Sequence, residues 1–274
     1  MWTRLMYMDV IYSYTCHESP DAFIDTLRNL IYYNTGLNIA IIVHCNPYMY
    51  AELTRLAVNL AAPVLLNNII TNKRMYTFDI IKAQCENILF CHDRGIKARY
   101  FVPLASNCYF HKHVTRELLH EYTSTPVPDI VPGIQPKSGW SGWQHLVCNP
   151  AMLAKLESDI GLRQDMYYCQ SHEGQILEYV AAVKMAQCVI DLPVERETMF
   201  EESIIASVYC CLTGKAPRLS LNHIFWNRWP SVVPSIEDIL SCEVPCVKRV
   251  SRNYGDPIRV WQRSLTGDYA GTTM

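Results

Sequence analysis

The sequence lacks the features that would assign it at once to several large functional classes. It has no run of about 18 apolar residues, the length that a membrane-spanning helix needs. Neither Gly-x-Gly-x-x-Gly nor Gly-x-x-x-x-Gly-Lys-Ser/Thr occurs, so the dinucleotide fingerprint and the P-loop are both absent. The net charge is only −2, with no obviously basic face. We therefore expect no transmembrane segment and no nucleic-acid partner.

Zinc and disulfide motifs are also missing, although the chain has twelve cysteines. No Cys-x-x-Cys pair occurs, and neither Cys210-Cys211 nor the pair Cys242 and Cys246 has the spacing of a zinc site. Residues 1–6 run into an apolar segment without the layout of a signal peptide. A chain of 274 residues, half of them hydrophobic, can bury a sizeable core without disulfides. We expect reduced, mostly buried thiols in a cytoplasmic protein.

Short apolar runs alternate with segments of helical spacing over residues 1–110. Each apolar run is the length of a strand, and a continuous run such as 39–43 is typical of a parallel strand covered on both faces. This alternation predicts an α/β fold with a mostly parallel, Rossmann-like sheet flanked by helices. Strands are expected at 10–14, 39–43, 64–66 and 100–104, and helices from Ser19 to Gly36, at 48–61 and at 75–92.

The second half of the chain has a different pattern. Residues 123–142 are rich in proline and glycine and predict a long functional or mobile loop. Helices are expected at 150–158, 172–188 and 202–211, and irregular chain from residue 217 on. We expect one domain over residues 1–274, with a nucleotide-binding half at 1–115 and an acceptor and catalytic half at 138–274.

Two charged segments suggest transfer chemistry. Glu201 and Glu202 enter the apolar segment 203–208, and in a helix only one of two neighbours can face the core side. A carboxylate turned toward a pocket can act as a general base, whereas a carboxylate pair can also simply stabilise the start of a helix. Lys248, Arg249 and Arg252 can hold a phosphate, or they can form a solvated strand edge. Together they outline a transferase with a nucleotide leaving group.

Polar residues follow two of the predicted strands, at the sheet edge where nucleotides bind in such folds. They are His44 and Asn46 after the second strand, and Ser106 and Asn107 after the fourth. These residues can contact a donor or can be ordinary polar groups at strand ends.

Several further residues can each have one of two roles. Trp140 and Trp143 can stack on a sugar ring or anchor their loop on the core. Glu173 can contact an acceptor or belong to the start of a helix at 175. His111 and His113 are a possible metal pair but lack a third ligand, so we expect structural roles for them.

Several ordered segments resemble motifs of one enzyme family. Residues 41–46 resemble a strand that ends in "IHVD", and residues 104–110 occupy the place of a "QDFP" turn. Residues 138–143 resemble an "SGS" region, and residues 200–203 resemble "PDE" followed by an aromatic. Residues 222–226, with Pro230 and Pro234, are similar to "KHIVDW", and residues 247–249 are similar to a late basic motif. The chain thus resembles the core-2/I-branching N-acetylglucosaminyltransferase and peptide O-xylosyltransferase family.

That resemblance implies a GT-A-like fold and an inverting, UDP-sugar-dependent glycosyltransferase. It implies that Glu202 is the catalytic base and that Lys248 contacts the diphosphate, with Arg249, Arg252 and Arg218 as further candidates. The chain departs from the family at Asn46, where the family tends to have aspartate, and at Asn107. The expected donor-binding residues are His44, Asn46, Phe78, Ser106, Asn107, Arg218, Lys248, Arg249 and Arg252, and the expected acceptor-binding residues are Trp140, Trp143 and Glu201.

The residues also bear on the metal requirement and the substrates. No Asp-x-Asp occurs, so fixed cations rather than a metal would neutralise the leaving diphosphate. We expect no essential metal or cofactor. The expected donor is UDP-xylose, slightly favoured, or UDP-N-acetylglucosamine, and the acceptor is a glycan or glycoprotein. Eukaryotic members of that family are usually anchored in a membrane, and because this sequence shows neither anchor nor signal we expect a cytoplasmic enzyme of viral or microbial glycan assembly. The alternatives are a non-catalytic carbohydrate- or nucleotide-binding protein on the same fold and a metal-dependent retaining transferase with another fold variant.

Overall fold

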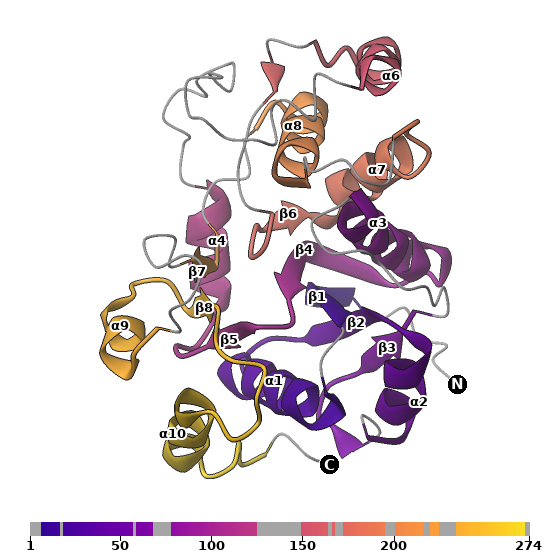
Figure 1. Cartoon of the computed structure of the whole chain (residues 1–274). Coiled ribbons are helices and arrows are strands. Elements are labelled where there is room, and N and C mark those ends of the chain that lie inside the picture. The colour runs from indigo at the N-terminus through magenta and orange to yellow at the C-terminus, as the bar shows by residue number, and fades with distance from the viewer. Residues whose placement is uncertain are drawn as a thin grey trace.

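The computed structural model describes residues 7–16, 19–56, 59–67, 78–124, 149–163, 166–167, 172–194, 201–215, 220–224 and 234–271. Within these residues the chain has a mostly parallel central sheet with helices on both faces and a smaller sheet beside it (Figure 1). This arrangement confirms the predicted α/β class and the Rossmann-like character of the sheet.

The central sheet contains the strands that the apolar runs predicted. Its strand order is β3-β2-β1-β4-β6, in which the first four strands are parallel and β6 runs antiparallel to β4. Every residue of β2 is buried, as expected of a parallel strand with helices on both sides. The strands are β1 (Tyr7–Cys16), β2 (Ile39–Cys45), β3 (Val64–Leu66), β4 (Lys97–Ala105) and β6 (Leu177–Glu178).

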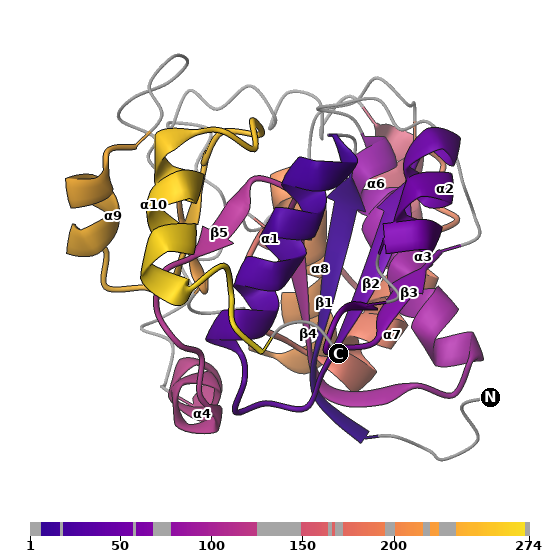
Figure 2. The same cartoon turned by 90° about the horizontal axis from the view of Figure 1, so that it is seen from below.

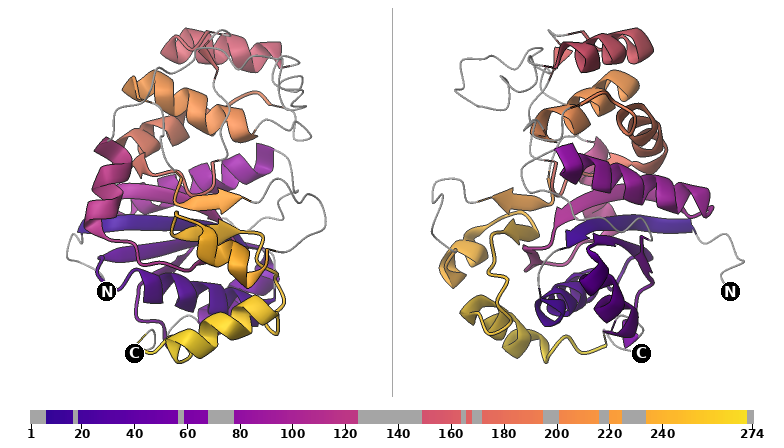
Figure 3. Two further views of the ribbon diagram at one scale, coloured as in Figure 1. Left: turned by 90° about the vertical axis from the view of Figure 1, so that its left-hand side faces the viewer. Right: turned by 45° about the vertical axis from the view of Figure 1, so that its right-hand side comes forward.

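Two groups of helices cover the two faces of this sheet, as Figure 3 shows. Side chains alternate along β1, so that Tyr12 and Tyr14 pack on the side of α1, whereas Ile11 packs on the side of α3. The first group is α1 (Pro20–Tyr33) and α2 (Pro47–Leu56), and the second is α3 (Phe78–Asp93), α7 (Tyr179–Val189) and α8 (Glu201–Thr213). The helix α6 (Pro150–Ile160) lies farther from the sheet, beyond α8 (Figure 1).

The smaller sheet joins residues from the two halves of the chain. Its order is β5-β8-β7, with β5 antiparallel and β7 parallel to β8. Tyr109, Val247, Ile258 and Tyr269 form a separate apolar cluster between this sheet and the C-terminal helices. Figure 2 shows α10 alongside α1. The elements are β5 (Cys108–Phe110), α4 (Arg116–Ser124), β7 (Asn222–Ile224), α9 (Ile236–Ser241), β8 (Cys246–Lys248) and α10 (Pro257–Thr266).

Two predictions about the second half are wrong. The helix expected at 172–188 begins only at Tyr179, because Gly174 takes a φ of +79° and Leu177 pairs with Phe101 in β4. The chain after residue 217 is not irregular throughout, since it contains β7, α9, β8 and α10. The Oδ1 atom of Asp256 caps α10 by accepting a hydrogen bond of 2.9 Å from the amide of Ile258.

Two further observations concern the described residues as a set. None of the helices among them is long and apolar enough to cross a membrane. The ten cysteines that lie within the described ranges all have free thiols.

Candidate functional site

The strand order places a topological switch point between β1 and β4. The chain leaves β1 toward β2 and β3 on one side, and β4 pairs with β1 on the other. Thr15 lies next to His44 of β2 and next to Ala105 of β4, so the three strands end at one edge. In open α/β sheets, ligands bind outside the carboxyl ends of the strands at such a point. This carboxyl edge is therefore the place to look for a functional site.

On the β2 side of the carboxyl edge, both predicted residues have partners in the protein. The Nε2 atom of buried His44 lies 2.9 Å from the Oε2 atom of Glu86 in α3. The Oδ1 atom of Asn46 accepts a 2.8 Å hydrogen bond from the amide of Met49 and so caps the start of α2. His44 and Asn46 thus lie at the predicted edge, where each also has a structural role.

A chain of buried polar side chains extends from this edge along the α3 face of the sheet, and sequence reasoning missed it. Asn67 donates a 2.9 Å hydrogen bond to Asn87, and Asn87 donates one of 2.9 Å to Ser13 in β1. Ser13 in turn donates to Gln84. The signal in the sequence was a serine inside an apolar strand and two amide side chains three residues apart on one helix, which meet on one face.

On the other side of the edge, the small sheet brings a cation next to the end of β4. The turn Ser106-Asn107 joins β4 to β5, and Cys108 at the start of β5 pairs with Lys248 of β8. Ser106 is buried, and its carbonyl oxygen lies 3.4 Å from the Oγ1 atom of Thr26 in α1. Three of the predicted residues, Ser106, Asn107 and Lys248, are therefore neighbours.

Glu173, for which the sequence left open an acceptor contact or a helix start, completes this group. Glu173 forms an ion pair with the Nζ atom of Lys248, and the two side chains are only 12% and 23% exposed. Partial burial strengthens such a pair relative to one in open water. Glu173 therefore holds the ammonium group of Lys248 beside the turn at the end of β4.

Gly174 allows the segment that carries Glu173 to fit between two sheets. Its amide donates a 2.6 Å hydrogen bond to the carbonyl oxygen of Pro103 in β4, and its carbonyl accepts one of 2.8 Å from Leu221. A Cβ atom at this position would lie 2.5 Å from the Cβ atom of Asn222 and 2.6 Å from the Oγ atom of Ser220. No side chain fits there, so glycine at this position is a steric requirement.

Basic residues are concentrated in the segment that begins at Lys248. Lys248, Arg249 and Arg252 lie within five consecutive residues, and Glu173 is the carboxylate paired with them through Lys248. The backbone of Arg249 has a φ of +83°, which residues other than glycine rarely adopt. Burial lowers the pKa of neighbouring His172, so this imidazole is neutral near pH 7. Three basic residues therefore lie in the segment that begins at Lys248, next to an imidazole that is neutral.

The buried thiol of Cys246 lies beside this group but is a poor nucleophile. Burial raises the pKa of Cys246 well above the ordinary value, and the neighbouring thiol of Cys108 raises it further. A thiol with a raised pKa stays protonated near pH 7, and only the thiolate is reactive. These two side chains are part of the core and do not suggest covalent catalysis.

Some of the remaining predicted site residues have described side chains, and the others do not. Phe78 begins α3 and is 3% exposed in the apolar core, so it offers little surface to a ligand. Arg252 is exposed and Arg249 is half-buried. Glu201 and Glu202 are the first two residues of α8, which confirms a helix there, but their side chains lie outside the described part of the structure. Trp140, Trp143 and Arg218 lie outside the described residues altogether.

The described residues contain no group of three or more histidine, cysteine or acidic side chains that could hold a metal ion. The Nε2 atom of His111 lies 2.8 Å from the carbonyl oxygen of Val244, and the ring of His113 packs against Tyr32 and Tyr33. Both histidines thus have structural contacts. Metal independence of a reaction stays a prediction.

No protein-family model matches the chain, and no curated protein matches it either. The family resemblance of the sequence motifs is therefore an expectation that only experiment can test.

Proposed function

We propose that the protein is an inverting glycosyltransferase. It transfers a sugar, with xylose slightly favoured over N-acetylglucosamine, from a UDP-sugar to a hydroxyl of a glycan or glycoprotein. The observation that carries this proposal is the pairing of Cys108 with Lys248, which brings a cation to the end of β4 at the switch point of a parallel sheet. A nucleotide with a diphosphate suits a site that combines this edge with fixed positive charge.

In this proposal the cations replace a metal ion at the diphosphate. Lys248 contacts the diphosphate directly, and Arg249, Arg252 and Arg218 supply further positive charge. Such groups stabilise the negative charge that develops on UDP as it leaves, because their orientation is fixed before the reaction begins. Glu173 keeps Lys248 in place when the donor is absent. His44, Asn46, Ser106 and Asn107 lie at the edge where the nucleoside would bind.

The proposed chemistry is a single displacement at the anomeric carbon. Glu202, in the first turn of α8, accepts the proton of the acceptor hydroxyl, and the hydroxyl oxygen forms a bond to the anomeric carbon. The bond from that carbon to the diphosphate oxygen breaks on the opposite side, and UDP departs with the electron pair. Glu201, Trp140 and Trp143 are the proposed acceptor contacts.

The test is the melting temperature of the purified protein with UDP and with individual UDP-sugars, in EDTA and in Mn²⁺. A ligand at 100 times its Kd stabilises the folded state by about 2.7 kcal/mol, and for a chain of this size we expect the melting temperature to rise by about 5 °C. The UDP-sugar that gives a rise in EDTA is then the donor for an acceptor screen. No rise with any nucleotide, with or without metal, would contradict the proposal.

Three variants separate the roles of the site residues. Lys248→Met is expected to lose most of the UDP-dependent rise, whereas Lys215→Met, which removes an exposed lysine paired with Glu178, keeps it. Glu202→Gln is expected to keep the rise but lose turnover, since the amide cannot accept the proton. Donor binding without turnover in the unaltered protein, over the whole acceptor screen, would favour a non-catalytic binding protein.

A further inference from the structure

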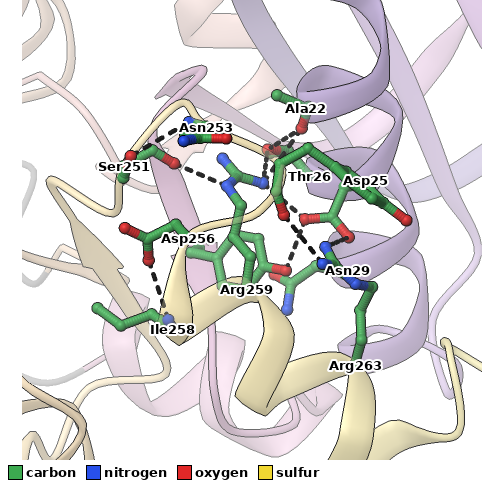
Figure 4. Close-up of polar contacts among 12 residues, drawn as sticks. Ala22, Asp25, Thr26, Asn29, Ser251, Asn253, Asp256, Ile258, Arg259 and Arg263 are labelled. Atoms are coloured by element: carbon green, nitrogen blue, oxygen red, sulfur yellow. Dashed lines mark hydrogen bonds and ion pairs between the residues drawn. The ribbon is translucent and has the colours of Figure 1, made fainter.

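The side chain of Arg259 in α10 connects three separate segments of the chain, as Figure 4 shows for its direct contacts. It is fully buried, with 0% exposure. Its Nε atom donates a 2.7 Å hydrogen bond to the carbonyl oxygen of Ser251. Its Nη1 atom lies 3.1 Å from the carbonyl oxygen of Ala22, 2.7 Å from Asp25 Oδ2 and 3.1 Å from Thr26 Oγ1.

Two of these contacts, to Ser251 and to Thr26, lead to the candidate site. Ser251 belongs to residues 249–252, the segment that contains Arg249 and Arg252, which we call the basic loop. Thr26 Oγ1 also lies 3.4 Å from the carbonyl oxygen of Ser106, the residue that follows β4 at the switch point. One guanidinium group thus fixes the basic loop relative to α1, and the hydroxyl of Thr26, which donates a 3.1 Å hydrogen bond to the carbonyl oxygen of Ala22, lies beside the turn Ser106-Asn107.

The arrangement depends on the shape of arginine. A guanidinium group is planar and has five donors in a rigid fork, so its Nε and Nη1 atoms can bond to acceptors on different segments at once. Lysine has the same charge but a single nitrogen, which cannot reach both the carbonyl of Ser251 and the carboxylate of Asp25. A buried ion pair by itself contributes little net stability compared with apolar residues of the same size. We therefore infer the role of Arg259 from the geometry of its contacts and not from a contribution of its charge to stability.

We propose that Arg259 is a positioning residue that holds the basic loop at the carboxyl edge of the sheet. The expected effect of Arg259 on binding of the donor rests on the function proposed above. If the loop is released, Arg249 and Arg252 lose their fixed distance from the turn Ser106-Asn107. Misplacing binding groups by about 1 Å can cost an enzyme up to about 100-fold in activity even when the groups themselves are intact.

The test compares Arg259→Lys with the control Gln262→Leu. Gln262 is also buried in α10, and its side chain accepts a 2.8 Å hydrogen bond from Tyr33 of α1 rather than from the basic loop. Both variants weaken the contact between α10 and α1. Amide hydrogen exchange of residues 249–252 and the apparent Kd for UDP are measured on both proteins, after circular dichroism has shown that each is folded.

We expect faster exchange in the basic loop and a Kd for UDP raised by about 10- to 100-fold in Arg259→Lys, with neither change in Gln262→Leu. Thr26→Val is a second variant that leaves the buried charges balanced, and a smaller increase in Kd is expected because the hydroxyl contact beside Ser106 is lost. Unchanged exchange in Arg259→Lys, or equal changes in Arg259→Lys and Gln262→Leu, would overturn the positioning role. If exchange changes as expected but the unaltered protein does not bind UDP, the positioning role stands and the proposed function fails.

Discussion

Replacing Gly174 by alanine is expected to destabilise the protein more than any ordinary glycine substitution. The φ of +79° costs a residue with a Cβ atom about 1–2 kcal/mol. The new methyl group would also lie 2.5 Å from the Cβ atom of Asn222 and 2.6 Å from the Oγ atom of Ser220. Overpacking of this kind costs about 1–3 kcal/mol. The sum predicts a loss of about 2–5 kcal/mol in the free energy of unfolding.

Gly95→Ala is the matched control, since it isolates the steric part of this loss. Gly95 has a φ of +69°, but no heavy atom lies within 4 Å of the position that its Cβ atom would take. Both substitutions restrict the unfolded chain to the same extent, so that contribution cancels. Gly95→Ala is therefore expected to cost only the backbone part, about 1–2 kcal/mol.

Urea unfolding of both variants measures the difference directly, and the slope of each curve shows whether the transition stays two-state. The melting temperature provides a second measure, at about 2–4 °C per kcal/mol for a large domain. Because Gly174 positions Glu173 against Lys248, a weaker UDP-dependent rise is also expected in Gly174→Ala and not in Gly95→Ala. Equal losses of stability in the two variants would refute the steric argument.

Two other predictions concern buried charge and protonation. Asp25 lies between Arg259 and Arg263, at 2.7 and 3.0 Å, and Asp25→Asn is expected to cost about 3–5 kcal/mol because it leaves two cations without their carboxylate. Asp159→Asn, which breaks an exposed pair, should cost less than about 1 kcal/mol in the same urea assay, and similar losses would contradict the buried-charge argument. Burial lowers the pKa of His111 from 6.5 to about 4, so the unfolded chain takes up this proton first and stability falls as the pH drops from about 6.5 to 4. His111→Gln should reduce that fall in unfolding experiments at several pH values, and an equally steep fall in the variant would show that another group is responsible.

The local pattern of apolar and polar residues was sufficient to predict the main strands and helices of the molecule. The apolar runs at 39–43 and 64–66 predicted β2 and β3, and the longer run matches a fully buried parallel strand, which needs apolar side chains on both faces. A helix at 202–211 was also predicted, from carboxylates that precede an apolar segment, and α8 begins one residue earlier, at Glu201. The signal for α10 was present in Asp256-Pro257, a capping residue followed by proline, but the surrounding aromatic and proline-rich composition concealed it.

Only the tertiary structure decided which charged groups share a site. Lys248 and Glu173 meet because β8, a strand of three residues, pairs with β5 and because Gly174 lets the segment 172–175 approach β4. Three residues are too few to show the alternation of a strand, and no local pattern reports which distant strand will be the partner. Arg259 likewise carries no signal of burial in the sequence. The sequence by itself determined the sheet and its carboxyl edge, whereas long-range pairing and packing selected the residues at that edge.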